Sequence, residues 1–397
     1  MQTIRILRIT STLSKGGAGA HVLAIHRAVN RIDGFASYLW CPRESVDEER
    51  VIPKLLPKSV VLFNAVRTRV LGLDSLYAPL FSSLLSKLAP RFDIIHLHHL
   101  EGYFFDLRSL YLLQEKNVVL TLHDMWPLTG RCSFSQNCEK WQTHCVSCPH
   151  TDVYPAVWID RSAFLHEQKK RAFAALNSLK LVAISEHAAE NVRYSHLKGA
   201  PLSVIPPAID CSMLFPEERR NAQPVIGAVA VRHDFSTKGF EDLMQFILYV
   251  RDAGLPFRFR LVGRLSTDAQ KQLKCLPHVD LFPFTGNLDE LRRHYNAMSL
   301  LINLSRQETF GKTNIEAQAC GIPVLARDIP PFRENVHFGA LCGDCSPETL
   351  RRMVDSLLDR HWPREEMHAE IKRRYDLSIL GERYAALYRS FFEGEIK

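Results

Sequence analysis

Residues 300–326 constrain the fold more than any other part of the sequence. The apolar run Leu300–Leu304 predicts a buried parallel strand, and the polar loop after it leads into a short helix predicted from about Lys312 to Cys320. Gly321 can adopt the left-handed conformation that ends a helix. A second strand is predicted over Val324–Ala326. This order of elements is typical of an α/β domain with a parallel sheet.

The loop of this unit carries groups that suit a ligand with both hydroxyls and phosphates. Ligands of open α/β sheets bind at the carboxyl edge of the strands, where this loop is expected to lie. The first N–H groups of the helix lack intrahelical partners and favour an anion. Glu308 on the loop and Glu316 on the helix add two carboxylates. A phosphate-loop NTPase is excluded, because its motif needs glycine where this chain has Arg306.

The same stretch resembles the Glu-x7-Glu motif of the family-4 retaining glycosyltransferases, with Glu308 and Glu316 as the pair. The residues around the pair match the family as well. The resemblance implies the GT-B fold, an α/β architecture of two Rossmann-like domains facing a central cleft. It also implies that Glu316 binds the ribose of a nucleotide sugar, and that Glu308 holds the sugar hydroxyls and phosphate together with the amides of Thr309, Phe310, Gly311 and Lys312.

Cations follow the first predicted strand of the second half of the chain. Arg232 ends this strand, and Lys238 precedes the next predicted helix. A departing diphosphate needs positive charge as the glycosidic bond breaks, and the resemblance matches these two residues to the family's diphosphate clamp. Gly286 lies where the family holds the nucleobase by backbone contacts. The chain contains no Asp-x-Asp, so we expect a metal-independent reaction that requires no cofactor.

The first half of the chain begins with a strand, a glycine turn and a helix. A strand is predicted over Ile4–Thr10 and a helix over Val22–Val29. The glycine run between them lacks the third glycine of the dinucleotide fingerprint, which disfavours an NAD site. The resemblance implies that Gly16 and Gly17 face the donor phosphates and the acceptor. It also implies that His123 lies near the donor sugar and the bond being made.

Three further patterns in the first half allow alternatives. A strand is predicted over Ser59–Phe63, and Arg67–Leu88 predicts one or two helices with basic and apolar faces. These helices either pack on the sheet or touch a membrane that holds a lipid-linked acceptor. His96 and His98 form a His-x-His pair on a predicted strand, but the acid ligands that a barrel metalloenzyme adds are not seen.

Four cysteines lie close together in the sequence, with His144 and His150 beside them. One tetrahedral Zn²⁺, disulfides and free thiols all remain open, since the Cys-x2-Cys pair is well formed but the other gaps are irregular. Similar insertions occur in family-4 enzymes that resemble colanic-acid glycosyltransferases, and they are accessory to the fold. The candidate zinc ligands are Cys132, Cys138, Cys145 and Cys148.

Length and composition bound the organisation of the chain. Its 397 residues, 46% of them hydrophobic, are enough for two or three domains. We expect an N-terminal acceptor-side domain over 1–205 with the cysteine-bearing insertion at 130–150, a nucleotide-sugar-binding domain over 206–375, and a helix over 376–397 that returns to the first domain. With no apolar run long enough to span a bilayer, we expect a cytoplasmic protein or one at the cytoplasmic face of the inner membrane.

These features predict a retaining, hexosyltransferase-type enzyme. It would move a sugar from a nucleotide diphosphate sugar to a glycan or polyprenyl-linked acceptor, in exopolysaccharide or lipopolysaccharide biosynthesis. A nucleotide-sugar epimerase can share the fold, but the Glu-x7-Glu setting favours transfer. A zinc-bearing nucleic-acid-binding protein would gather basic residues and aromatics on one face. Here the net charge is only +7 and the basic residues are interspersed with acids, so no nucleic-acid partner is expected.

Overall fold

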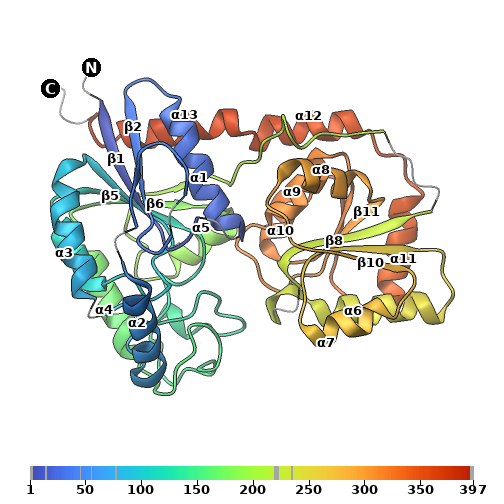
Figure 1. Ribbon diagram of the computed structural model, residues 1–397, viewed down its shortest axis with the longest axis horizontal. Helices are drawn as coiled ribbons and strands as arrows, with labels where there is room; N and C mark the ends of the chain where they lie inside the picture. Colours follow the sequence, from blue (N-terminus) through green and yellow to red (C-terminus); the bar gives the residue numbers. More distant parts are fainter. Residues whose placement is uncertain are drawn as a thin grey trace. The chain divides into compact units, whose positions relative to one another are not determined.

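Two compact units make up the chain (Figure 1). The computed structural model describes residues 3–13, 16–44, 46–54, 56–76, 78–218, 223–233 and 236–393. Unit 1 comprises Met1–Pro206 and Ser378–Lys397, and unit 2 comprises Pro207–Leu377. Each unit has its own parallel sheet, so each is a separate α/β domain.

Unit 1 is built on a seven-stranded parallel sheet of order β3-β2-β1-β4-β5-β6-β7. Its central strands are buried on both faces, which is why they are almost continuously apolar in the sequence. The strands are β1 (Ile4–Ile9), β2 (Phe35–Trp40), β3 (Val51–Ile52), β4 (Ile94–Leu97), β5 (Asn117–Leu122), β6 (Ser178–Ala183) and β7 (Leu202–Val204). The helices are α1 (Gly16–Asn30), α2 (Lys58–Leu71), α3 (Pro79–Leu88), α4 (Ser162–Ala174), α5 (Glu186–Arg193) and α13 (Leu377–Arg389), with 3₁₀ turns η1 (Ala89–Arg91), η2 (Leu107–Leu113) and η3 (Lys140–Gln142).

Unit 2 is built on a six-stranded parallel sheet of order β10-β9-β8-β11-β12-β13. The strands are β8 (Val225–Arg232), β9 (Arg258–Arg264), β10 (Val279–Phe282), β11 (Leu300–Asn303), β12 (Val324–Arg327) and β13 (Gly339–Cys342). The 3₁₀ turn η4 (Ser236–Lys238) precedes the first helix. The helices are α6 (Phe240–Asp252), α7 (Thr267–Lys274), α8 (Leu288–Asn296), α9 (Lys312–Ala319), α10 (Pro330–Asn335), α11 (Pro347–Leu358) and α12 (Arg364–Tyr375).

Both sheets reverse their strand order at one point. In unit 1 the reversal lies between β1 and β4, and in unit 2 it lies between β8 and β11. Connections leave neighbouring strands in opposite directions at such a point, and the loops there leave a crevice at the carboxyl edge of the sheet. The loops after β8 and β11, and those after β1 and β4, are therefore the expected ligand-binding positions.

Helix α13 at the end of the chain packs on the sheet of unit 1 (Figure 1). Tyr384 and Tyr388 are fully buried there. The Tyr388 hydroxyl lies 2.8 Å from Nδ1 of His96 on β4, and Nε2 of the same imidazole lies 2.8 Å from the Thr121 hydroxyl. Nη1 of Arg8 also lies 2.6 Å from His96 Nδ1. His96 is therefore a buried hydrogen-bonding residue that connects β1, β5 and α13.

Two expectations about local structure are wrong. Residues 59–63 belong to helix α2, not to a strand, and α1 begins at Gly16, so Gly16 and Gly17 lie in the first helical turn and not in a loop before it. The α2 pattern misleads because its buried residues are the polar Asn64 and Thr68, while Leu62 and Phe63 are exposed. No helix in the described part of the chain combines the length and apolar character needed to cross a bilayer.

The variant Tyr388→Phe tests how α13 is held on unit 1. Removing the hydroxyl leaves a buried imidazole without one hydrogen-bond partner, so we expect a loss of about 1 kcal/mol in the free energy of unfolding. In a unit of this size the loss lowers Tm by roughly 2–4 °C. Thermal unfolding by calorimetry measures it. The control is Tyr194→Phe, at an exposed tyrosine, and equal Tm values for the two variants would contradict the assignment.

Candidate functional site

The loop between β11 and α9 forms the centre of the candidate site in unit 2. Gly311 occupies the position before the first residue of α9 with φ +86°, and a Cβ there would lie 2.4 Å from the ring of Phe332. Only glycine fits this conformation and this contact. The turn leaves the first N–H groups of α9 pointing away from the helix, at the point where β8 and β11 diverge. Thr309, Phe310, Gly311 and Lys312 thus form one continuous backbone turn.

The two predicted carboxylates lie at this turn with different partners. Glu308 is ion-paired with Nζ of Lys238, and the Ser305 hydroxyl lies 3.4 Å from the same carboxylate oxygen. Glu316 is buried within α9 and accepts a 2.9 Å hydrogen bond from the Tyr295 hydroxyl. Nζ of Lys312 lies 3.7 Å from its other oxygen. Burial raises the pKa of Tyr295 well above its usual value, so this phenol remains a hydrogen-bond donor.

Buried amides that the sequence did not single out fix the shape of the turn. Asn303 donates from its amide to the Asn314 side chain at 2.8 Å, and Asn314 donates to Asn335 at 2.9 Å. Asn335 in turn donates to the carbonyl of Phe310. The Gln318 amide donates to the carbonyl of Asn335 at 2.8 Å. Such a fully satisfied buried network holds a loop in one conformation.

The loop after β8 packs directly against the loop after β11. Gly239 lies before the first residue of α6 with φ +63°, and a Cβ there would lie 2.0 Å from the carbonyl oxygen of Leu304. The N–H of Arg306 donates to the carbonyl of Thr237 at 2.7 Å. Lys238 is thereby brought to Glu308, while Arg232 is exposed at the end of β8.

Gly286 lies on an exposed loop after β10, directly before Asn287, whose side chain caps α8. A Cβ at Gly286 would meet no atom within 4 Å, so its backbone is open to a ligand.

In unit 1 the predicted site residue His123 belongs to a cluster of buried histidines. His98 follows β4 and His123 follows the adjacent β5, and Nδ1 of His98 lies 3.1 Å from Nε2 of His123. The His123 ring also stacks on the His99 ring, with centroids 4.4 Å apart, and meets the His21 ring edge-on. Burial, reinforced by the neighbouring histidines, holds the pKa of His123 well below 6.5. The imidazole is therefore neutral at neutral pH.

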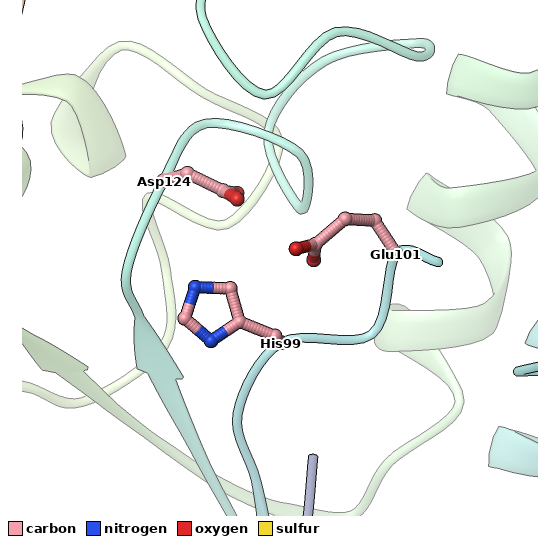
Figure 2. Close-up of side chains that lie close together, drawn as sticks. All are labelled: His99, Glu101 and Asp124. Atoms are coloured by element: carbon pink, nitrogen blue, oxygen red, sulfur yellow. The ribbon is translucent and has the colours of Figure 1, made fainter. Parts of the chain in front are cut away.

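Two acids lie beside the histidine cluster. Figure 2 shows the side chains of His99, Glu101 and Asp124 around one space, with the two carboxylates directed towards each other. One ligand-type atom from each residue lies within 4.8 Å of the others. Burial raises the pKa of Glu101 to about 7, and burial together with the Glu101 charge raises the pKa of Asp124 to about 7. Sequence analysis missed this group, because its members come from two loops on neighbouring strands.

The structure does not support the predicted zinc site. Cys132, Cys138, Cys145 and Cys148 are all described, and they line one small cavity as free thiols. No three of their sulfurs lie within 4.8 Å of one another, a spacing that the His99 group satisfies. The segment is instead organised by the buried Arg131 guanidinium, which donates to three backbone carbonyls. Burial raises the pKa of the Cys145 thiol to about 11.

Comparisons with known proteins agree with this geometry in both halves of the chain. Residues 15–213 match the family model described as Glycosyltransferase Family 4, and residues 223–360 match the model described as Glycosyl transferases group 1. The first match alone covers half of the chain. The chain belongs to glycosyltransferase family 4. Since this family has the GT-B fold, the two Rossmann-like units of the structure are its two domains.

A named relative resembles this family 4 glycosyltransferase over most of its length. It is 27% identical over 357 residues to the Escherichia coli K12 protein that is named for colanic acid biosynthesis as glycosyl transferase WcaC. The alignment covers 83% of this chain and 85% of the relative. An alignment of this length must include parts of both units, so each unit is related to WcaC.

Solved structures share the fold over the whole chain. HepE of Anabaena in complex with UDP-glucose superposes with a TM-score of 0.62 at 15% identity, covering 98% of this chain and all of HepE. A Listeria monocytogenes protein named as a UDP-N-acetylglucosamine 2-epimerase superposes with a TM-score of 0.59 at 13% identity, covering 99% and 97%. A protein named as an epimerase therefore shares the fold, and it is the family match that identifies this chain as a glycosyltransferase.

Proposed function

We propose that this glycosyltransferase moves a hexosyl group from a nucleotide diphosphate sugar to a hydroxyl acceptor, with retention at the anomeric carbon. The observation that carries the proposal is the turn between β11 and α9. It combines outward N–H groups with Glu308 and Glu316 at the point where the strand order of unit 2 reverses. UDP-glucose in the complex with HepE supports a nucleotide sugar as the donor.

In this proposal each part of the turn binds one part of the donor. Glu316 accepts hydrogen bonds from the ribose hydroxyls, and the Tyr295 hydroxyl keeps its carboxylate in place. The amides of residues 309–312 bind the diphosphate at the start of α9. Glu308 holds the hydroxyls of the sugar. The open backbone of Gly286 contacts the nucleobase.

Arg232 and Lys238 stabilise the diphosphate as it leaves. Charge develops on the leaving group in the transition state, and preorganised cations are worth most there. The ion pair between Lys238 and Glu308 keeps the lysine at the turn. No Asp-x-Asp accompanies these cations, so the proposed transfer needs no divalent ion at the diphosphate. Gly16 and Gly17, at the start of α1, would face the donor phosphates and the acceptor. His123 would lie beside the reacting sugar, where its neutral imidazole can form a hydrogen bond with a hydroxyl.

Thermal shift with nucleotides tests the donor site. We expect one of UDP, GDP or ADP to stabilise the wild-type protein by roughly 2.7 kcal/mol when present at about 100 times its Kd. The variant Lys238→Ala should respond weakly, because it lacks one cation at the diphosphate. In a transfer assay the same change should lower kcat by roughly 10²–10³-fold.

Lys274→Ala is the matched control, since Lys274 is an exposed lysine on α7 of the same unit. It should respond to the nucleotide as the wild type does. Failure of all three nucleotides to stabilise the wild type, or equal responses from Lys238→Ala and Lys274→Ala, would contradict the proposed donor site.

We further propose that the acceptor is a polyprenyl-linked glycan of exopolysaccharide biosynthesis, and that unit 1 meets it at an anionic membrane surface. The name of the relative WcaC supports the pathway. Helix α2 supports the membrane contact, because Leu62, Phe63 and Val66 project from it and are all exposed. Phe63 retains 66% of its accessible surface. Helix α2 exposes apolar side chains and buries polar ones, which is the reverse of an ordinary amphipathic helix.

The exposed apolar surface continues onto the segment after the cysteines. Trp158 is 69% exposed, and its backbone N–H donates to the backbone carbonyl of Arg69 on α2 at 2.8 Å. Helix α2 carries Lys58, Arg67 and Arg69 and no acidic residue. Insertion of aromatic side chains and attraction of basic residues to anionic lipids together give stable peripheral binding.

Vesicle sedimentation tests this surface. We expect the wild-type protein to bind vesicles that contain phosphatidylglycerol, with affinity that falls as salt rises. The double variant Phe63→Ser/Trp158→Ser should bind vesicles roughly tenfold or more weakly, because it lacks the two aromatic side chains that would insert into the lipid. The control is Tyr111→Ser/Leu112→Ser, which removes two other exposed apolar side chains of unit 1. Equal binding by the two double variants would refute the surface.

A further inference from the structure

We propose that His99, Glu101 and Asp124 form a divalent-cation site at the carboxyl edge of the unit 1 sheet. All three residues belong to unit 1, and the proposal does not rest on the function proposed above. His99 and Glu101 lie on the loop after β4, and Asp124 lies on the loop after β5, which is the adjacent parallel strand. A cation bound here would connect the two loops.

The spacing of the three side chains suits one ion. Their ligand atoms lie within 4.8 Å of one another. Two ligands that are each about 2.1 Å from one ion lie at most about 4.2 Å apart, so only small rotations of the side chains would complete the site. Figure 2 shows that the two carboxylates and one edge of the His99 ring face the same space.

None of the three side chains has an oppositely charged side chain as an ion-pair partner among the described residues. Within the part of the chain that the structure describes, neither Glu101 nor Asp124 forms an ion pair, and Nδ1 of His99 is buried without a hydrogen-bond partner. The ring is nevertheless only 9% exposed. Two carboxylates brought together without a cation destabilise each other, and a buried imidazole without a partner loses its hydrogen bonds to water. A bound cation would offset both costs.

The nearest buried lysine does not supply the missing charge by direct contact. Lys169 of α4 donates instead to the carbonyl oxygens of Trp126 and Thr129, at 2.6 and 3.0 Å. Oδ1 of Asp124 accepts a 2.8 Å hydrogen bond from the backbone N–H of Trp126, which leaves Oδ2 of Asp124 for a ligand. The Asp124 carboxylate is thus oriented by the same loop whose carbonyls hold the lysine.

The donor set indicates which cations fit. One imidazole and two carboxylates suit Mn²⁺ and Zn²⁺, while Mg²⁺ prefers oxygen ligands alone. Glu101 and Asp124 are only partly buried, so further coordination positions remain open to solvent or to an oxygen ligand of the acceptor. The His99 ring stacks on His123, so cation binding would also fix the position of that imidazole.

Mn²⁺ binding to the nucleotide-free, full-length protein tests the site. Mn²⁺ is the probe because thiols bind it weakly, which keeps the four cysteines out of the measurement. We expect one equivalent of Mn²⁺ to bind the wild type, observed as loss of the free-ion electron paramagnetic resonance signal. Glu101→Gln and Asp124→Asn should each weaken binding by roughly tenfold or more. Both changes keep the size of the side chain, and Asp124→Asn keeps the acceptor for Trp126.

The matched control is Asp33→Asn, which removes an exposed carboxylate from unit 1 and should bind Mn²⁺ as the wild type does. Unfolding curves recorded in EDTA establish that each variant is folded, and either of the two site variants alone is sufficient for the comparison. The proposal is overturned if the wild type leaves millimolar Mn²⁺ free, or if folded Glu101→Gln or Asp124→Asn binds Mn²⁺ with the affinity of the Asp33→Asn control.

Discussion

The close approach of the loops after β8 and β11 is the constraint on which the donor site of unit 2 depends. Gly239 lies so close to the carbonyl of Leu304 that no side chain fits between them. Gly311 makes the same kind of approach to Phe332. These two contacts fix where α6 and α9 begin, and therefore where their unpaired N–H groups point. Lys238, Glu308 and the backbone of residues 309–312 take their positions from these two turns.

The carboxyl edge of the unit 1 sheet carries a different set of groups. It gathers His98, His99 and His123 where burial favours neutral imidazoles, and it places two carboxylates beside them. A neutral cluster suits hydrogen bonds to sugar hydroxyls, whereas paired carboxylates suit a cation. His96 shows that burial of a histidine alone does not indicate function, because all of its bonds go to Arg8, Thr121 and Tyr388.

Sequence patterns were informative where chemistry and burial act on consecutive residues. Strands such as β11 and β5 are mostly apolar because parallel strands are covered on both faces. Gly321 adopts its left-handed conformation one residue beyond the C-cap of α9, as expected. Residues 59–63 of α2 were mistaken for a strand, because a helix with a polar buried face lacks the usual pattern. The links from Asn303 of β11 through Asn314 of α9 to Asn335 of α10 join separate elements, and the group around Asp124 joins separate loops, so no local spacing could reveal them. Four nearby cysteines left zinc, disulfides and free thiols open, and in the structure they are free thiols with no three sulfurs within 4.8 Å of one another.

Hydrogen–deuterium exchange with and without nucleotide tests the central claim most directly. The wild-type protein would be incubated with UDP, GDP and ADP in turn, and exchange would be read by mass spectrometry in peptides that cover residues 305–316 and 236–242. We predict that one of these nucleotides slows exchange in both segments, because the diphosphate binds the first N–H groups of α9 and the loop before α6. A nucleotide that stabilises the protein but leaves both segments unprotected would contradict the account, since the donor would then bind elsewhere.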